Sequence, residues 1–342
     1  MEFDARLPIN RRLAYKRYHV AMMTIGDCDP QYPALRYVAD RMELNEEQRF
    51  WLAFLFSLSY CAPTALYMLN EFPDYENVCS RRLSDWWIKN KHNTLFQTDR
   101  AKVKNFDKIV PIFESYRQMM GTSQKRVWDG LLSGSQTDTY RTAFKKMGNI
   151  YYFGRFTLFL FLESVHQLTG FPMRPDILDL RDAESCRNGL CMALGLDSWV
   201  GAKLSDAHYN RLQAELAKIE AELTRENASL PVNIWNIETS LCAFKKLFLS
   251  KRYFGYYIDR QQEEILVMQE NVQTGVYWEM LWQYRKAYYN PRYLGEIMGW
   301  KGPRKSELCR FANTGKIGDG AEVYVKYKST AKIPTDRRSY DV

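Results

Sequence analysis

The sequence lacks any apolar stretch long enough to cross a membrane. Its longest predominantly apolar runs, at 51–58 and 156–162, fall well short of the ~20 residues that a membrane-spanning helix needs. Charged residues also stand near the start of the chain, at Glu2, Asp4 and Arg6, where a secretion signal would be apolar. We therefore expect a soluble protein that stays in the cytoplasm.

Residues that commonly bind metal ions are few and scattered. The seven cysteines form no CxxC pair, and none of the four histidines lies at metal-ligand spacing from them. Only Cys186 and Cys191 are close together in the sequence. We therefore expect reduced, mostly buried thiols rather than a zinc site. His166 stands on an apolar stretch, where we expect a packed side chain rather than a ligand.

The motifs of several large enzyme classes are absent as well. The sequence contains no GxxxxGK(S/T) phosphate loop, no GxGxxG after a strand, no HExxH and no GxSxG. Each of these motifs supplies the backbone or side-chain groups that its chemistry requires. Their absence argues against ATP hydrolysis at a P-loop, dinucleotide redox chemistry and zinc-dependent hydrolysis.

The chain has a large apolar fraction and an excess of positive charge. Of its 342 residues, 46% are hydrophobic and 15% are aromatic, which is typical of a folded protein with a sizeable core. Lysine and arginine number 48 against 40 aspartate and glutamate residues, which gives a formal net charge of +8. This moderate excess favours a polyanionic partner such as a nucleic acid.

Helical periodicity dominates the sequence. Asn45 and Gln48 have the spacing of a capping box, and Gly121 and Gly170 are typical of residues that end helices. The best strand pattern is the alternation at 321–328, which follows three glycines. The helices that these signals predict cover 46–60, 106–120, 151–169, 205–223, 234–249, 260–272 and 276–288.

These elements predict an all-α, mainly helical fold with a small C-terminal β-hairpin or edge strand. No linker rich in glycine, serine or proline divides the chain, and no internal repeat stands out. We therefore expect one compact helical domain over residues 1–330. The alternative is that this domain consists of two lobes that meet near 196–232. Residues 331–342 have the composition of a loose tail.

Arginine and lysine alternate with aromatic residues in four parts of the chain. Such cations can neutralise phosphates, and flat rings can stack on unpaired bases at ~1–3 kcal/mol each. For any single cluster, a better explanation is that the rings belong to the core and the cations to its solvated edge. Four clusters in a chain of positive charge favour nucleic acid. They lie within 81–91, 140–155, 245–260 and 285–293.

One candidate site lies on the helix predicted at 151–169. Arg155 and Glu163 bracket an otherwise apolar segment, and their spacing of eight residues is about two helical turns. Both side chains can therefore face one side of the helix. Because a buried charge must be paired or serve a ligand, the alternative is a mutual structural salt bridge between the two across a neighbouring helix.

Two further segments carry polar groups. Arg187 and Asn188 lie at a predicted loop-to-helix junction within 180–190, and a helix N-terminus beside arginines can bind a phosphate. Asp259 and Arg260 follow a pair of tyrosines. Asp259 could simply cap the helix that follows it.

The order of these segments resembles a known family. GRF at Gly154 is followed by Glu163, then by SCRNGL from Ser185 and by YYIDRQQEEI from Tyr256. A tryptophan-rich helix and Tyr293-Leu294-Gly295 come next, and the stretch around 41–55 is similar too. Over roughly residues 30 to 310, the chain resembles the amino acid:DNA transferases, relatives of the α-glutamyl/putrescinyl thymine pyrophosphorylases of phages that hypermodify thymine. The resemblance implies an all-helical fold related to the helix-hairpin-helix DNA glycosylases.

The resemblance also implies a reaction. A kinase first converts 5-hydroxymethyluracil in DNA to its pyrophosphate ester. The transferase then expels pyrophosphate from the C5 methylene, and an amino acid, of which glycine is the simplest, adds through its amine. The implied partners are DNA carrying a modified thymine and a free amino acid, and no cofactor is needed. The amino acid, the DNA sequence context, the oligomeric state and any metal requirement stay open.

Such a reaction requires cations, a carboxylate and a pocket for a flipped base. Arg155, Arg187 and Arg260 are the candidates for stabilising the departing pyrophosphate, and Asn188 could hold a base edge or a phosphate oxygen. The base that deprotonates the amine is expected to be Glu163 first, Asp259 second and Glu238 third. Two rival functions remain: a glycosylase that cuts the base from its sugar, and a non-catalytic DNA-binding protein.

Overall fold

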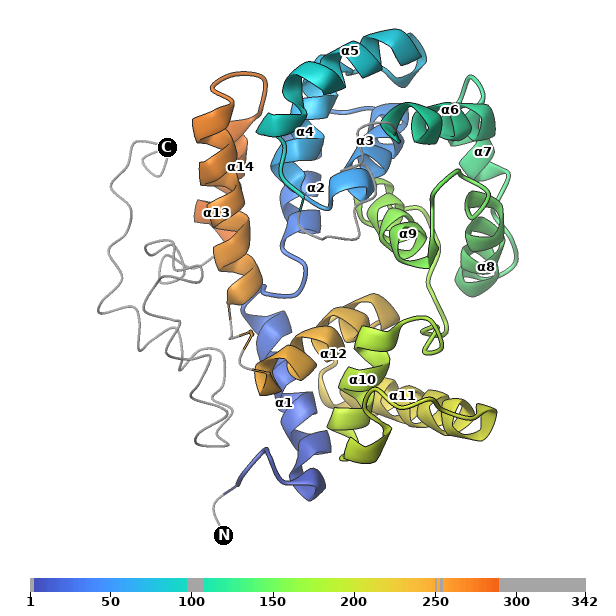
Figure 1. Cartoon of the computed structure of the whole chain (residues 1–342), viewed down its shortest axis with the longest axis vertical. Helices are drawn as coiled ribbons and strands as arrows, with labels where there is room; N and C mark the ends of the chain where they lie inside the picture. Colours follow the sequence, from blue (N-terminus) through green and yellow to red (C-terminus); the bar gives the residue numbers. More distant parts are fainter. Residues whose placement is uncertain (1–2, 97–107, 250, 253–254, 289–342) are drawn as a thin grey trace. The chain divides into compact units, whose positions relative to one another are not determined.

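The computed structural model describes residues 3–96, 108–249, 251–252 and 255–288. Within these ranges the chain is helical and contains no β-strand, which confirms the all-α expectation (Figure 1). The strand expected at 321–328 lies outside the described residues. The helices are α1 (Arg11–Thr24), α2 (Gln31–Arg41), α3 (Glu46–Ser59), α4 (Ala62–Glu71), α5 (Ser80–Asn90), α6 (Ile109–Met120), α7 (Gln124–Asp129), α8 (Gln136–Met147), α9 (Arg155–Thr169), α10 (Glu184–Ala193), α11 (Asp206–Glu226), α12 (Ile234–Phe248), α13 (Tyr256–Asn271) and α14 (Trp278–Tyr288).

The chain divides into two compact units. Of the described residues, unit 1 comprises 3–30, 175–260 and 286–288, and unit 2 comprises 31–174 and 261–285. The segment 196–232 lies inside unit 1. Among the described helices, none combines the length and the apolar character that a membrane crossing requires.

The core of unit 2 is built around α3, which packs against α4 and α9 (Figure 1). The capping box predicted at its start is present, with Asn45 and Gln48 each accepting a hydrogen bond from the backbone N–H of the other. Aromatic side chains fill this core. Trp51 is fully buried and its indole N–H donates to the carbonyl of Phe72 at 2.7 Å. Much of the aromatic content of this unit therefore serves packing.

Several helix boundaries follow the sequence signals, but the start of α9 does not. Gly121 and Gly170 end α6 and α9 with positive φ angles, as expected. The helix expected from residue 151 begins only at Arg155. Tyr152 adopts a left-handed φ of 65°, and the backbone at Gly154 is extended, so the chain turns sharply before helix formation can start.

In unit 1, α11 lies on the surface as its pattern predicts. Ser205 caps the helix, and Leu212, Leu216, Ile219 and Leu223 form its buried stripe. On its charged side, Arg12 of α1 forms ion pairs of 2.7 and 2.6 Å with two glutamates of α11, Glu215 and Glu222. The amphipathic pattern of this helix therefore determines both its buried and its charged contacts.

The helices α10 and α12 approach each other unusually closely in unit 1. A Cβ atom placed on Gly189 of α10 would lie 2.2 Å from the carbonyl oxygen of Leu241 of α12. No side chain fits in that space, because real Cβ contacts are essentially never under 3.0 Å. Gly189 is therefore required for the distance between the two backbones rather than for a special φ angle.

We expect Gly189→Ala to destabilise the protein by about 1–3 kcal/mol, the usual cost of forcing extra atoms into a packed contact. Urea unfolding followed by circular dichroism measures the change. Gly130→Ala is the matched control, because its Cβ would make only an ordinary contact of 3.4 Å with a carbonyl oxygen. Equal stability of the two variants would contradict the close approach of α10 to α12.

Candidate functional site

The sequence-predicted site residues belong to two different units. Arg155 and Glu163 lie in unit 2, on α9, whereas Arg187, Asn188, Asp259 and Arg260 lie in unit 1. The third candidate base, Glu238, is also in unit 1, on α12. The expected convergence of Arg155 with the unit 1 arginines therefore stays a prediction, and each group is described in its own unit.

Glu163 is a buried carboxylate in the core of unit 2. Only 4% of its surface is exposed, on a helix that is otherwise apolar. The hydroxyl of Tyr32, on α2, donates a hydrogen bond of 3.0 Å to its Oε2. A charge in such surroundings must be stabilised by hydrogen bonds, and Tyr32 supplies one of them.

Arg155 is half-buried at the first position of α9. Gly154 provides no side-chain cap and the first turn contains no acidic residue. A cation at the positive end of a helix is unfavourable unless an anion compensates it. Within the described part of the chain Arg155 forms no ion pair, so the structure does not bear out a mutual salt bridge between Arg155 and Glu163.

Arg187 and Asn188 are largely buried and bonded to the backbone around them. Arg187 Nη1 donates to the carbonyls of Leu180 and Arg181 at 3.2 and 2.8 Å. Asn188 Oδ1 accepts from the backbone N–H of Gly201 at 3.0 Å. These contacts hold the segments on either side of α10. Roles with pyrophosphate or a base edge stay predictions for both residues.

The structure corrects the interpretation of Asp259 as a possible helix cap. Helix α13 begins at Tyr256, four residues before the predicted start, so Asp259 lies within its first turn. Asp27 provides the cap instead. Its Oδ2 accepts from the backbone N–H of Gly255 at 2.9 Å, and its Oδ1 from those of Tyr257 and Ile258 at 2.9 and 3.0 Å.

Sequence reasoning missed Asp27 and its neighbour Asp29. Both are buried, and Asp29 accepts a hydrogen bond from the hydroxyl of Thr239 on α12. Burial raises the pKa of Asp27 to about 8, and the nearby Asp259 acts in the same direction, against the three backbone N–H groups. The available signal was the run Gly26-Asp27-Cys28-Asp29-Pro30, which sets two acidic residues beside a helix end.

Three donor atoms from distant parts of the sequence meet between α10 and α12. The Sγ of Cys186 lies 2.7 Å from Oε1 of Glu238 and 3.1 Å from the Sγ of Cys242. Oε1 of Glu238 lies 3.8 Å from the Sγ of Cys242. Burial and these two neighbours raise the pKa of the Cys186 thiol well above its usual value. The cysteines scattered in the sequence are thus partly gathered in the fold.

Most rings of the four basic aromatic clusters are packed inside the protein where they are described. Trp86, Trp87 and Tyr140 are buried, as the structural explanation predicted. The exception is the turn between α8 and α9, where Tyr151 and Tyr152 are 43% and 39% exposed. Their ring centroids are 5.2 Å apart.

Basic side chains accompany this exposed pair in unit 2. The Nζ of Lys108 lies 5.5 Å from the centroid of the Tyr152 ring. Arg141, Lys145 and Lys146, on α8, are exposed. Exposed rings with cations nearby in the sequence suit stacking on bases and contact with phosphates.

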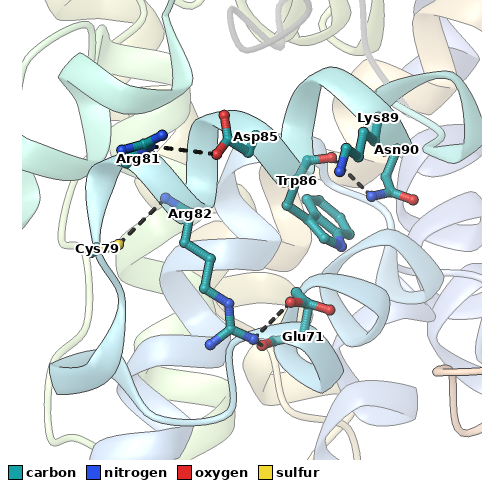
Figure 2. A pocket seen from close by; sticks show the side chains of 8 residues that line it. All are labelled: Glu71, Cys79, Arg81, Arg82, Asp85, Trp86, Lys89 and Asn90. Atoms are coloured by element: carbon teal, nitrogen blue, oxygen red, sulfur yellow. Dashed lines mark hydrogen bonds and ion pairs between the residues drawn. The ribbon is translucent and has the colours of Figure 1, made fainter.

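A shallow pocket of about 350 Å³ lies along α5 (Figure 2). Three basic residues line it, but Arg82 pairs with Glu71 at 2.7 Å and Arg81 lies 4.0 Å from Asp85. These acidic residues offset much of its positive charge. The pocket is therefore a weaker candidate for an anion than the α8–α9 turn.

Stability should depend on pH through Asp27. Because the pKa of this carboxyl is raised from 3.8 to about 8 in the folded protein, the folded state binds more protons than the unfolded state between those values. Its contribution to the free energy of unfolding therefore falls as pH rises through this range. Asp27→Asn removes the titration, so the variant should gain stability relative to wild type between pH ~5 and ~8.

Urea unfolding of both proteins at the two ends of this pH range measures the difference. Asn keeps one oxygen to accept from the N-terminus of α13, which limits the loss of capping. A stability difference that does not change with pH would mean that Asp27 stays charged throughout.

Comparison with known proteins identifies one family. The family model described as amino acid:DNA transferase matches residues 23–254. No curated protein and no solved structure matches the chain significantly. The matched range runs from the end of α1 past α12 and contains Asp27, Arg155, Glu163 and the cysteines that meet between α10 and α12. Asp259 and Arg260 lie just beyond it.

Proposed function

The chain belongs to the amino acid:DNA transferase family, and we propose that it joins an amino acid to a modified thymine by displacing pyrophosphate. The observation that carries this proposal is the family match over residues 23–254. The substrate would be 5-pyrophosphoryloxymethyluracil in DNA, in the pathway by which phages hypermodify thymine. Glycine, or an amino acid like it, would be the nucleophile.

The reaction replaces one bond at the C5 methylene carbon. The carbon–oxygen bond breaks and its electron pair leaves with pyrophosphate, while the amine nitrogen forms a new bond to carbon. A free amino acid is an ammonium ion near neutral pH, so it must lose a proton before it can attack. The protein must supply a proton acceptor and positive charge for the leaving group.

Glu163 is the proposed proton acceptor. Its burial on α9 removes it from bulk water, and the hydrogen bond from Tyr32 fixes the orientation of the carboxylate. Asp259, which is 3% exposed on α13, is the second candidate. Glu238 is the third, and its contacts with two cysteines support a different role.

Arg155 is the proposed partner of the leaving group. Its place at the uncapped N-terminus of α9 combines a guanidinium with backbone N–H groups that favour anions. The negative charge of a pyrophosphate would neutralise the guanidinium and accept hydrogen bonds from the N–H groups. Arg187 and Arg260 are the further candidates, and Asn188 could orient a base or a phosphate.

The exposed pair of Tyr151 and Tyr152 is the proposed contact with DNA. It lies in the turn immediately before α9, so a strand stacked there would bring its phosphates close to Arg155. The reaction acts on a base, which must leave the duplex stack to be reached. Exposed rings could hold the strand in that state.

We expect the protein to convert DNA containing the pyrophosphorylated base into an amino acid adduct when a mixture of amino acids is supplied. Mass spectrometry of the released nucleosides identifies the product. A glycosylase would produce abasic sites, and a non-catalytic DNA-binding protein would leave the base unchanged. Either of those results would overturn the proposed reaction.

Glu163→Gln tests the assignment of the base. Glutamine keeps the shape and can still accept from Tyr32, but it cannot take a proton from the amine. Transfer should fall by ~10²-fold or more, with DNA binding and melting temperature close to wild type. The matched control is Tyr32→Phe, which removes the hydrogen bond but keeps the carboxylate, and its loss of transfer should be smaller. If Glu163→Gln melts at a much lower temperature while its folded fraction still turns over normally, Glu163 is structural.

A further inference from the structure

We propose that Cys186, Glu238 and Cys242 bind a thiophilic divalent cation such as Zn²⁺ between α10 and α12. This inference does not rest on the proposed transfer reaction. It rests on three ligand atoms of the right chemistry, which all lie within 4.8 Å of one another. The sequence gives no hint of this site, because the cysteines are 56 residues apart.

All three ligands lie on helices rather than on loops. Glu238 and Cys242 are four residues apart on α12, and this spacing puts both side chains on one face of a helix. Cys186 lies on α10, three residues before Gly189. The close approach of Gly189 to Leu241 therefore sets Cys186 opposite the two ligands of α12.

The distances suit a metal after small side-chain movements. Zinc bonds of about 2.3 Å to sulfur and about 2.1 Å to oxygen, in tetrahedral geometry, separate two sulfurs by about 3.8 Å and a sulfur from an oxygen by about 3.6 Å. The Cys186 sulfur lies 3.1 Å from that of Cys242 and 2.7 Å from the Glu238 oxygen. Opening the group by about 1 Å or less thus creates room for the ion.

The chemistry of the group favours a cation over a disulfide. Two thiols and a carboxylate are in contact, and their charged forms would repel one another without a positive ion between them. The Cys186 thiol currently donates to Glu238, a bond that a Cys186–Cys242 disulfide would eliminate. On metal binding, both thiol protons pass to solvent and the two thiolates and the carboxylate become ligands.

Thiolate ligands also determine which metals fit. Sulfur selects zinc and similar ions, whereas magnesium and calcium prefer oxygen ligands alone. Within the described part of the chain, no fourth histidine, cysteine or acidic residue joins the group. Three protein ligands leave one position for water or another small ligand. Cys242 is half-buried rather than fully buried, so an ion can enter from solvent.

The test uses the full-length protein, purified without chelators, loaded with Zn²⁺ and passed through buffer exchange. Elemental analysis should find one zinc per chain. After replacement by Co²⁺, the protein should show the sulfur-to-cobalt charge-transfer absorption of thiolate ligands. This second measurement needs no variant, so it does not depend on whether a substituted protein folds.

Two variants and a control localise the ion. Cys242→Ser and Glu238→Gln should each weaken zinc affinity at least about tenfold, measured by competition with a chromophoric chelator. Cys79→Ser is the control, because Cys79 is an exposed cysteine on unit 2, outside the group, and it should bind zinc as wild type does.

Three results would overturn the site. One is a wild-type protein that retains no zinc and shows no cobalt–thiolate absorption. A second is Cys242→Ser binding zinc as tightly as the control. The third is a Cys186–Cys242 disulfide found by mass spectrometry in protein that was purified under argon.

Discussion

The contact between the backbones of α10 and α12 is the constraint on which much of unit 1 depends. It exists because Gly189 has no side chain where Leu241 approaches. Once the two helices are this close, the residues beside Gly189 have fixed neighbours. Cys186 faces Glu238 and Cys242, and Lys245 of α12 donates to Ser185 of α10 at 2.9 Å. The SCRNGL segment is thus explained first by packing, and its chemistry follows from the packing.

Buried carboxyl groups are a second feature of the structure. Glu163, Asp27 and Asp259 are each at most 4% exposed, although burying a carboxylate is costly unless hydrogen bonds compensate. In the described contacts, Tyr32 compensates Glu163 and the N-terminus of α13 compensates Asp27. Proteins tend to keep such groups where function requires them. That tendency fits the proton transfer that we propose for this member of the amino acid:DNA transferase family.

The two units also differ in their exposed aromatic rings and their polar groups. In unit 2 the α8–α9 turn exposes Tyr151 and Tyr152 beside the uncapped start of α9. Unit 1 contains the thiol–carboxylate group and the capped start of α13. In the described part of the chain, most of the other aromatic residues that alternate with basic ones in the sequence are buried. A basic aromatic cluster in the sequence therefore does not show which of its rings are exposed, and only exposed rings can stack on a base.

Local signals in the sequence predicted seven of the fourteen described α-helices, α3, α6, α9 and α11–α14. The cap at Asn45 and the glycine ends at Gly121 and Gly170 depend on residues within one turn, and the structure has them as expected. The predicted start of α9 was wrong. The apolar periodicity continues through Tyr152, but the backbone of this residue is left-handed and the helix begins only after it.

The family, too, could be recognised from the order of short motifs. The arrangement of the candidate site could not. The cap on α13 comes from Asp27, more than 200 residues away, and Cys186 meets Cys242 across two helices. Hydrophobic periodicity shows which face of a helix is buried but not which other helix covers it. Only the tertiary packing, which includes a backbone contact between α10 and α12 too tight for any side chain, decides which distant polar groups share a buried space.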